Sequence, residues 1–209
     1  MIQIPAERAI GASSLLTNLI LVPFLFLILP SKLLMSGMTM LDLAFVEIAL
    51  GVGIFFAATF LVTRLQKHVT DHGVASIGVV FIGLPILCFS FLASIPPMCI
   101  AAFALGCGLT SFNVTVNAKR TTAIPDGFRS TMEATLRFFC VLSVPFGLWL
   151  AQAGMDAFGS NSVIALAVFP LVSSMAIVLF SKSLRAMLNT PRDGNPYYLG
   201  RYARLFDKE

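Results

Sequence analysis

The chain has 209 residues, of which 57% are hydrophobic and only 11% are charged, and its mean hydropathy is +0.90. A soluble protein of this length needs many more charged side chains on its surface. The composition therefore excludes an ordinary soluble domain. It predicts an all-α integral membrane protein whose surface is mostly covered by lipid.

Six segments are apolar enough to be transmembrane helices, each close to the ~20 residues that cross a ~30 Å hydrocarbon core. The turn between the third and fourth segments is assigned to "SIPP", and a basic loop containing Pro125 and Gly127 follows the fourth. Residues 182–209 form a basic cytoplasmic tail, which we interpret as flexible; the alternative is that its tyrosines and arginines rest at the anionic leaflet. The predicted spans are residues 10–30, 41–63, 74–94, 97–117, 131–153 and 161–181.

Lysine and arginine residues predict the orientation of these spans, because they stay on the cytoplasmic side during insertion. Twelve of the fourteen basic residues lie on the side of the termini. The opposite loops contain only Lys32, and the remaining residue, Arg137, lies within a span. We therefore expect a multi-pass protein of the cell inner membrane with both termini cytoplasmic. The net charge of +4 follows from this topology, and no nucleic-acid partner is expected.

Ionisable groups inside spans are functional candidates because they are costly at membrane depth unless they are paired or hydrated. Asp42 and Glu47 lie near the start of the second span, and Glu133 and Arg137 lie near the start of the fifth. Asp42 is close enough to the span end to be interfacial. Glu133 and Arg137 are spaced i,i+4, which fits either a simple surface ion pair or a pair facing an aqueous cleft.

The fourth span carries a small and polar stripe at helical spacing, made of Gly106, Thr110, Asn113 and Asn117. Such a stripe is expected on a helix that lines a packed seam or an aqueous cavity. Asn18, with its neighbours Ser14 and Thr17, gives the first span a similar side.

The sequence does not support an enzyme, a metal site or a bound cofactor. No G-x-S-x-G, H-E-x-x-H or Gly-rich phosphate loop is present. His68 and His72 are assigned to a solvated loop, and the four cysteines, which lack metal-type spacing, to apolar spans.

The six spans divide into two triplets of opposite orientation, a 3+3 inverted repeat. The stretch "FNVTVNAKRTTAIPDGFRSTMEATLRFFCVLSVPFGLWLAQAGMDAFG" also resembles the tenth and eleventh helices of bacterial major facilitator exporters, and the resemblance covers all six spans in order and length. The loop "TFLVTRLQKH" departs from the family pattern, since Thr59 and Thr63 replace its Gly and Asp. The residues that carry the resemblance are Asn113, Asn117, Ile124, Pro125, Arg129, Pro145 and Gly147.

The resemblance implies the C-terminal six-helix half of a transporter related to drug, macrolide or siderophore exporters. It implies proton-coupled efflux of a small hydrophobic or amphipathic solute by alternating access, with Glu47 as the proton-coupling candidate. Candidates for the substrate path and gate are Asn18, Glu47, Thr110, Asn113, Asn117, Glu133 and Arg137.

The partner of this half is then a second six-helix lobe, which is a separate chain, a missing N-terminal half or a second copy. The alternative interpretation is a six-helix membrane protein that does not transport, either an accessory subunit or an inert fragment.

Overall fold

The computed structural model describes residues 3–191 and 196–206, and these residues contain helices but no strand. Six helices are long and apolar enough to cross a membrane: Pro5–Met35, Met40–Leu65, Asp71–Cys88, Ile95–Ala123, Asp126–Phe158 and Ser162–Phe180. The expected all-α class and number of spans are therefore confirmed, and the fold indicates a multi-pass membrane protein.

The first two spans each contain a short π-helical segment. In the first span, α1 (Pro5–Pro23) is followed by η1 (Phe24–Ile28) and α2 (Leu29–Met35). The irregularity begins directly after Pro23, which has no N–H for the helix ladder. The second span consists of α3 (Met40–Phe56), η2 (Ala57–Leu61) and α4 (Val62–Leu65).

The other four spans are α5 (Asp71–Cys88), α6 (Ile95–Ala123), α7 (Asp126–Phe158) and α8 (Ser160–Leu166) continued by α9 (Val168–Phe180). The prediction of a long basic loop after the fourth span is wrong. Only Ile124 and Pro125 separate α6 from α7, because Pro125 holds Ile124 in an extended conformation and stops the helix there. The basic residues before this stop, Lys119 and Arg120, consequently lie on a helix.

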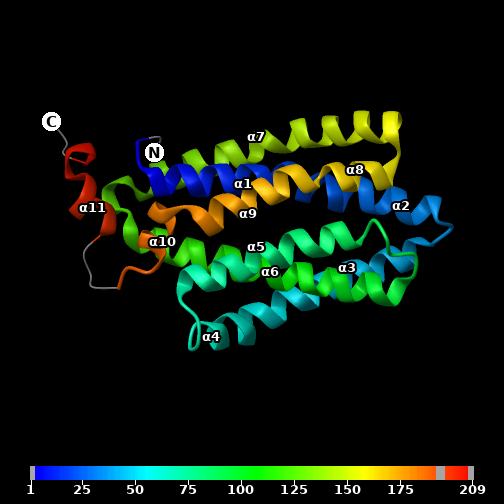
Figure 1. Ribbon diagram of the computed structural model, residues 1–209, viewed down its shortest axis with the longest axis horizontal. Coiled ribbons are helices and arrows are strands. Elements are labelled where there is room, and N and C mark those ends of the chain that lie inside the picture. The colour runs from blue at the N-terminus through cyan, green and yellow to red at the C-terminus, as the bar shows by residue number, and fades with distance from the viewer. Residues whose placement is uncertain (1–2, 192–195, 207–209) are drawn as a thin grey trace.

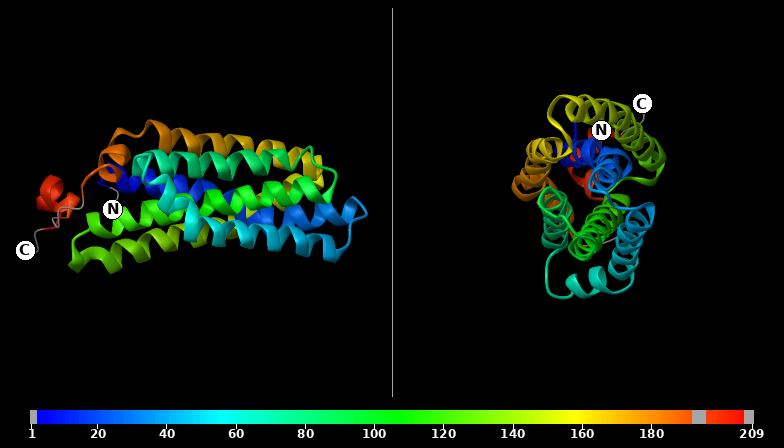
Figure 2. Two further views of the ribbon diagram at one scale, coloured as in Figure 1. Left: turned by 90° about the horizontal axis from the view of Figure 1, so that it is seen from below. Right: turned by 90° about the vertical axis from the view of Figure 1, so that its right-hand side faces the viewer.

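The spans form an elongated bundle, in which α1 and α6 are each flanked by two neighbours (Figures 1 and 2). α1 packs against α7 and α9, whereas α6 packs against α3 and α5. α5 and α9 also contact each other. α1 begins at the end of the bundle where α10 (Lys182–Leu188) and α11 (Tyr197–Tyr202) lie, which we call the terminal end (Figure 1). The opposite end is the distal end.

Glycines allow the closest helix contacts. A Cβ atom on Gly53 of α3 would lie 2.2 Å from the carbonyl oxygen of Phe103 on α6, and one on Gly106 would lie 2.3 Å from that of Leu50. A Cβ on Gly147 of α7 would lie 2.3 Å from the Leu19 carbonyl oxygen on α1. Pro23 has no N–H to bond that carbonyl, so α7 covers a point where the α1 ladder is broken.

The tail also differs from the flexible segment that its composition indicated. α10, α11 and the 3-10 turn η3 (Ala203–Leu205) follow the last span. The apolar residues Leu184, Met187 and Leu188 are buried, at i, i+3, i+4 spacing along α10. Tyr198 of α11 is also buried. The described part of the tail is therefore packed onto the terminal end of the bundle.

Candidate functional site

A buried ion pair joins α1 to α6 at the terminal end. The carboxylate of Glu7 is 0% exposed and Arg120 is 1% exposed. Arg120 donates through Nε to both Glu7 oxygens at 2.9 Å, and its Nη2 lies 2.9 Å from Glu7 Oε2. Because an unpaired buried charge costs several kcal/mol, each of these residues depends on the other.

Arg120 also binds α7, the third helix of this cluster. Its Nη1 lies 2.5 Å from Glu133 Oε2, and its Nη2 donates to the Met132 carbonyl oxygen at 3.0 Å. Glu133 in turn accepts a hydrogen bond from Arg137 Nε at 3.1 Å. Two carboxylates and two guanidinium groups therefore balance one another, from the buried Glu7 outward to Arg137, whose side chain is 77% exposed.

Tyr198 connects the tail to the same cluster. Its hydroxyl donates to Glu7 Oε1 at 2.9 Å, and its ring contacts those of Tyr197 and Tyr202. Burial, reinforced by the neighbouring Glu7 carboxylate, raises the pKa of the Tyr198 phenol far above its ordinary value. Tyr198 therefore acts as a neutral hydrogen-bond donor and adds no charge to the cluster. Glu7, Arg120, Glu133, Arg137 and Tyr198 are called the terminal network below.

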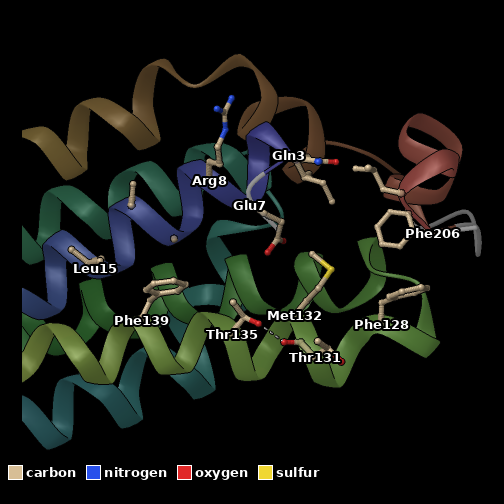
Figure 3. A pocket seen from close by; sticks show the side chains of 14 residues that line it. Gln3, Glu7, Arg8, Leu15, Phe128, Thr131, Met132, Thr135, Phe139 and Phe206 are labelled. Atoms are coloured by element: carbon tan, nitrogen blue, oxygen red, sulfur yellow. Dashed lines mark hydrogen bonds between the residues drawn. The ribbon is translucent and has the colours of Figure 1, made fainter. Parts of the chain in front are cut away.

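A groove of about 630 Å³ lies beside this network, between α1 and α7. Figure 3 shows Glu7 pointing into it from α1, opposite Met132 and Thr135 of α7. Phe206, which follows η3, lines the groove at its terminal end, where its ring lies 5.1 Å from that of Phe128. The groove is therefore formed by two spans and the end of the tail.

The predicted stripe on α6 is divided between two environments. Thr110 is buried and donates to the Ile54 carbonyl oxygen of α3 at 3.4 Å, so it faces a helix seam. Asn113 and Asn117 are exposed on α6. Asn18 is half-buried on α1, next to the Cys140 thiol of α7.

The two acids of the second span have different environments. Asp42 accepts hydrogen bonds from the backbone N–H and hydroxyl of Thr39 at 2.8 Å, and thus caps its own helix. Glu47 is exposed and has no hydrogen bond or ion pair within the described part of the chain. Gly51 and Ile54 lie on the same flank of α3 at helical spacing, and the exposed Phe45, Ile48, Val52 and Phe55 lie farther around the helix.

Two further ionisable groups have roles that the sequence did not indicate. Lys32 is buried and its ammonium group donates to the carbonyl oxygen of Phe89, the C-terminal cap of α5. A cation is favourable at that end of the helix dipole. His72 was assigned to a solvated loop, but it is buried in the first turn of α5 and its Nε2 donates to the Val178 carbonyl oxygen at 2.9 Å.

The central members of the terminal network were missed because no local pattern links them. Glu7 and Arg120 are separated by more than a hundred residues, and Arg120 was assigned to a loop. Tyr198 lies in a segment whose Pro, Gly and basic residues resemble a solvated tail. Only the i,i+4 pair Glu133 and Arg137 was visible in the sequence, and the structure contains that ion pair.

Within residues 3–191 and 196–206, no three His, Cys, Asp or Glu side chains gather as a metal site. The four cysteines are free thiols, and only Cys107 is fully buried.

No protein-family model matches the chain, and no curated protein or solved structure is significantly similar to it. Fold and site together define the class as a six-span α-helical membrane protein with a buried ionic network at one end.

Proposed function

We propose that this chain is one six-helix lobe of a secondary active transporter, and that a second lobe completes it. The observation that carries the proposal is Glu47, an exposed carboxylate on a helix of membrane-spanning length that has no partner among the described residues. Such a group is costly in lipid, so its flank of α3 is expected to face water or another protein. A solute pathway between two lobes provides both.

The arrangement of the helices supports an inverted repeat. An inverted repeat would exchange the first span with the fourth, the second with the fifth and the third with the sixth. Under this exchange the contact between α1 and α7 corresponds to the contact between α6 and α3, and both contacts are present. The same exchange turns α1–α9 into α6–α5 and leaves α5–α9 unchanged. The close contacts at Gly53 and Gly147 also correspond to each other under this exchange. These correspondences are expected of two triplets related by a pseudo-twofold axis.

The uncovered polar groups support a pathway next to α3, α6 and α7. α3 and α7 belong to the two spans that the rest of the chain buries least. Glu47 on α3, Asn113 and Asn117 on α6 and Arg137 on α7 are all exposed. In this proposal, Glu47 carries the coupling proton, while Asn113, Asn117, Glu133 and Arg137 belong to a gate at the terminal end.

The orientation and the solute belong to the same proposal. The basic residues support cytoplasmic termini in an inner membrane. The resemblance to major facilitator exporters supports a small hydrophobic or amphipathic solute that is exchanged for protons.

Reconstitution tests the proposal directly. Ethidium efflux driven by a pH gradient is measured in proteoliposomes that contain this chain alone, or this chain with a candidate six-helix partner. We expect flux only with a partner, and Glu47→Gln should abolish its dependence on the gradient. Asp42→Asn is the matched control, since Asp42 lies on the same helix but only caps it. Gradient-driven flux from the chain alone would contradict the need for a second lobe.

The terminal network is equally compatible with the alternative, a membrane protein that does not transport. Its charges are balanced and its tail ties α1, α6 and α7 together, which suits a static bundle as well as a rigid lobe. This alternative predicts that Glu47→Gln changes no flux with any partner.

A further inference from the structure

We propose that the groove between α1 and α7 is a binding site for an anionic phospholipid, with the acyl chain in the groove and the headgroup at the terminal end. Its volume of about 630 Å³ lies within the range of about 300–1,000 Å³ that is usual for small-molecule sites. The lining residues on α1 extend from Glu7 to Leu15, or about 12 Å at 1.5 Å per residue. This length is close to the depth of one leaflet, about half of a ~30 Å hydrocarbon core.

The groove lies on the other side of α7 from the exposed polar groups of the proposed pathway. Thr131, Thr135 and Phe139 line it at a spacing of four residues. Glu133 and Arg137 are each displaced by two residues from this row, which is about 200° around the helix. Ala12 of α1 and Thr131 of α7 are exposed on opposite walls, so the groove opens outward from the bundle. In a membrane this opening faces lipid.

The polarity of the lining changes along the groove. Gln3, Glu7 and Arg8 line the terminal half of the groove together with the rings of Phe128 and Phe206, while Leu15 and Phe139 lie deeper in the spans, as Figure 3 shows. The Glu7 carboxylate on the floor is already neutralised by Arg120 and leaves no free negative charge. A molecule with a polar head at the terminal end and an apolar chain pointing inward fits this gradient, as a phospholipid in the adjacent leaflet does.

The charge at the rim favours an anionic headgroup. Arg8 is exposed, and its guanidinium has no hydrogen-bond or ion-pair partner among residues 3–191 and 196–206. Figure 3 shows this side chain rising from α1, away from the α7 side chains that line the opposite wall. A base near the membrane surface attracts an anionic lipid by about 1 kcal/mol, or about fivefold in affinity.

Native mass spectrometry of the whole protein in detergent tests the site. The two lipid probes are palmitoyl-oleoyl phosphatidylglycerol and palmitoyl-oleoyl phosphatidylcholine, which have the same acyl chains and differ only in the headgroup. We expect preferential retention of phosphatidylglycerol and a loss of about fivefold in its affinity in Arg8→Gln. Arg64→Gln is the matched control, because Arg64 is an exposed base on α4 outside the groove. Equal retention of the two lipids, or equal losses in the two variants, would overturn the headgroup assignment.

Variants that fill the groove test the acyl-chain part of the site. Ala12→Phe should reduce retention of both lipids, and Thr131→Phe should do the same from the opposite wall. Both positions are exposed, so neither change enlarges a buried side chain. Size-exclusion chromatography identifies the folded variants, and undiminished lipid retention in a folded variant rejects the groove as the site. The readout requires no transport, so failure here is distinguishable from failure of the proposed function.

Discussion

Glu7 and Glu47 show two opposite environments for a carboxylate in helices of membrane-spanning length. Glu7 is fully buried and contacts Arg120 and Tyr198, at the meeting point of α1, α6 and the tail. Glu47 is exposed on α3 and has no partner in the described structure. The first charge is satisfied by the fold of this chain, whereas the second must be satisfied by something outside it. The comparison separates a group that stabilises the bundle from a group available for function.

The largest decrease in stability is expected when the guanidinium of Arg120, which holds the terminal network together, is removed. Arg120→Met leaves Glu7 buried without its cation and should lower the free energy of unfolding by about 3–5 kcal/mol. Denaturant-induced unfolding in detergent measures this change. The double variant with Glu7→Gln should be less destabilised than Arg120→Met alone, since both charges are then removed. A double variant that is destabilised by the sum of the single effects would contradict the pairing.

Removing the hydrogen bond between Tyr198 and Glu7 should cause the next largest decrease in stability. Tyr198→Phe keeps the ring but removes the donor to Glu7, and should cost about 1.5–3 kcal/mol, the range for a hydrogen bond to a charged group. Tyr202→Phe is the control, since no hydrogen bond of its hydroxyl occurs in the described structure.

The pH dependence of stability tests the same contact. The folded protein raises the Tyr198 pKa above the unfolded value of about 10, so this contribution is complete below about pH 10 and is lost as the pH rises further. The alkaline decline in stability should therefore be smaller in Tyr198→Phe than in the parent chain. An identical decline in both proteins would assign it to other groups.

A smaller decrease in stability is expected when Lys119 is replaced, at the point where α6 contacts the start of α5 and the residues that follow α10. Lys119 Nζ lies 3.0 Å from Asp71 Oδ2 and donates to the Thr190 carbonyl oxygen at 2.8 Å. Because this pair is partly solvated, Lys119→Met should cost about 1 kcal/mol in the same unfolding assay. Arg129→Met provides a comparison with the more exposed Arg129–Asp126 pair, for which the change should be close to zero.

The smallest effect on stability is expected at Glu47. Glu47→Gln should change the free energy of unfolding by no more than about 0.5 kcal/mol, because no contact within the described chain is lost. A cost near that of Arg120→Met would mean that Glu47 has a structural partner, and the contrast with Glu7 would no longer hold.

Part of the site was predictable because its members are close in the sequence. The Glu133–Arg137 pair follows from i,i+4 geometry. Glu47 was singled out as the proton-coupling candidate, and that role stays a prediction. Thr110 was grouped with Asn113 and Asn117 by spacing alone. Its seam position depends on how closely α3 approaches α6, and Gly53 and Gly106 set that distance.

The sequence by itself determined the class and the number of spans, because the hydropathy of about 20 side chains is a local property. The cost of unpaired backbone groups in lipid then requires each such segment to be helical. Tertiary structure alone decided that Arg120 and Tyr198 meet Glu7. Arg120 reaches Glu7 because α6 continues to Ala123 and α1 begins beside it, and Tyr198 reaches the pair only because the tail folds back. These contacts join residues that are distant in the chain, so their energies depend on helix packing that no sequence window contains.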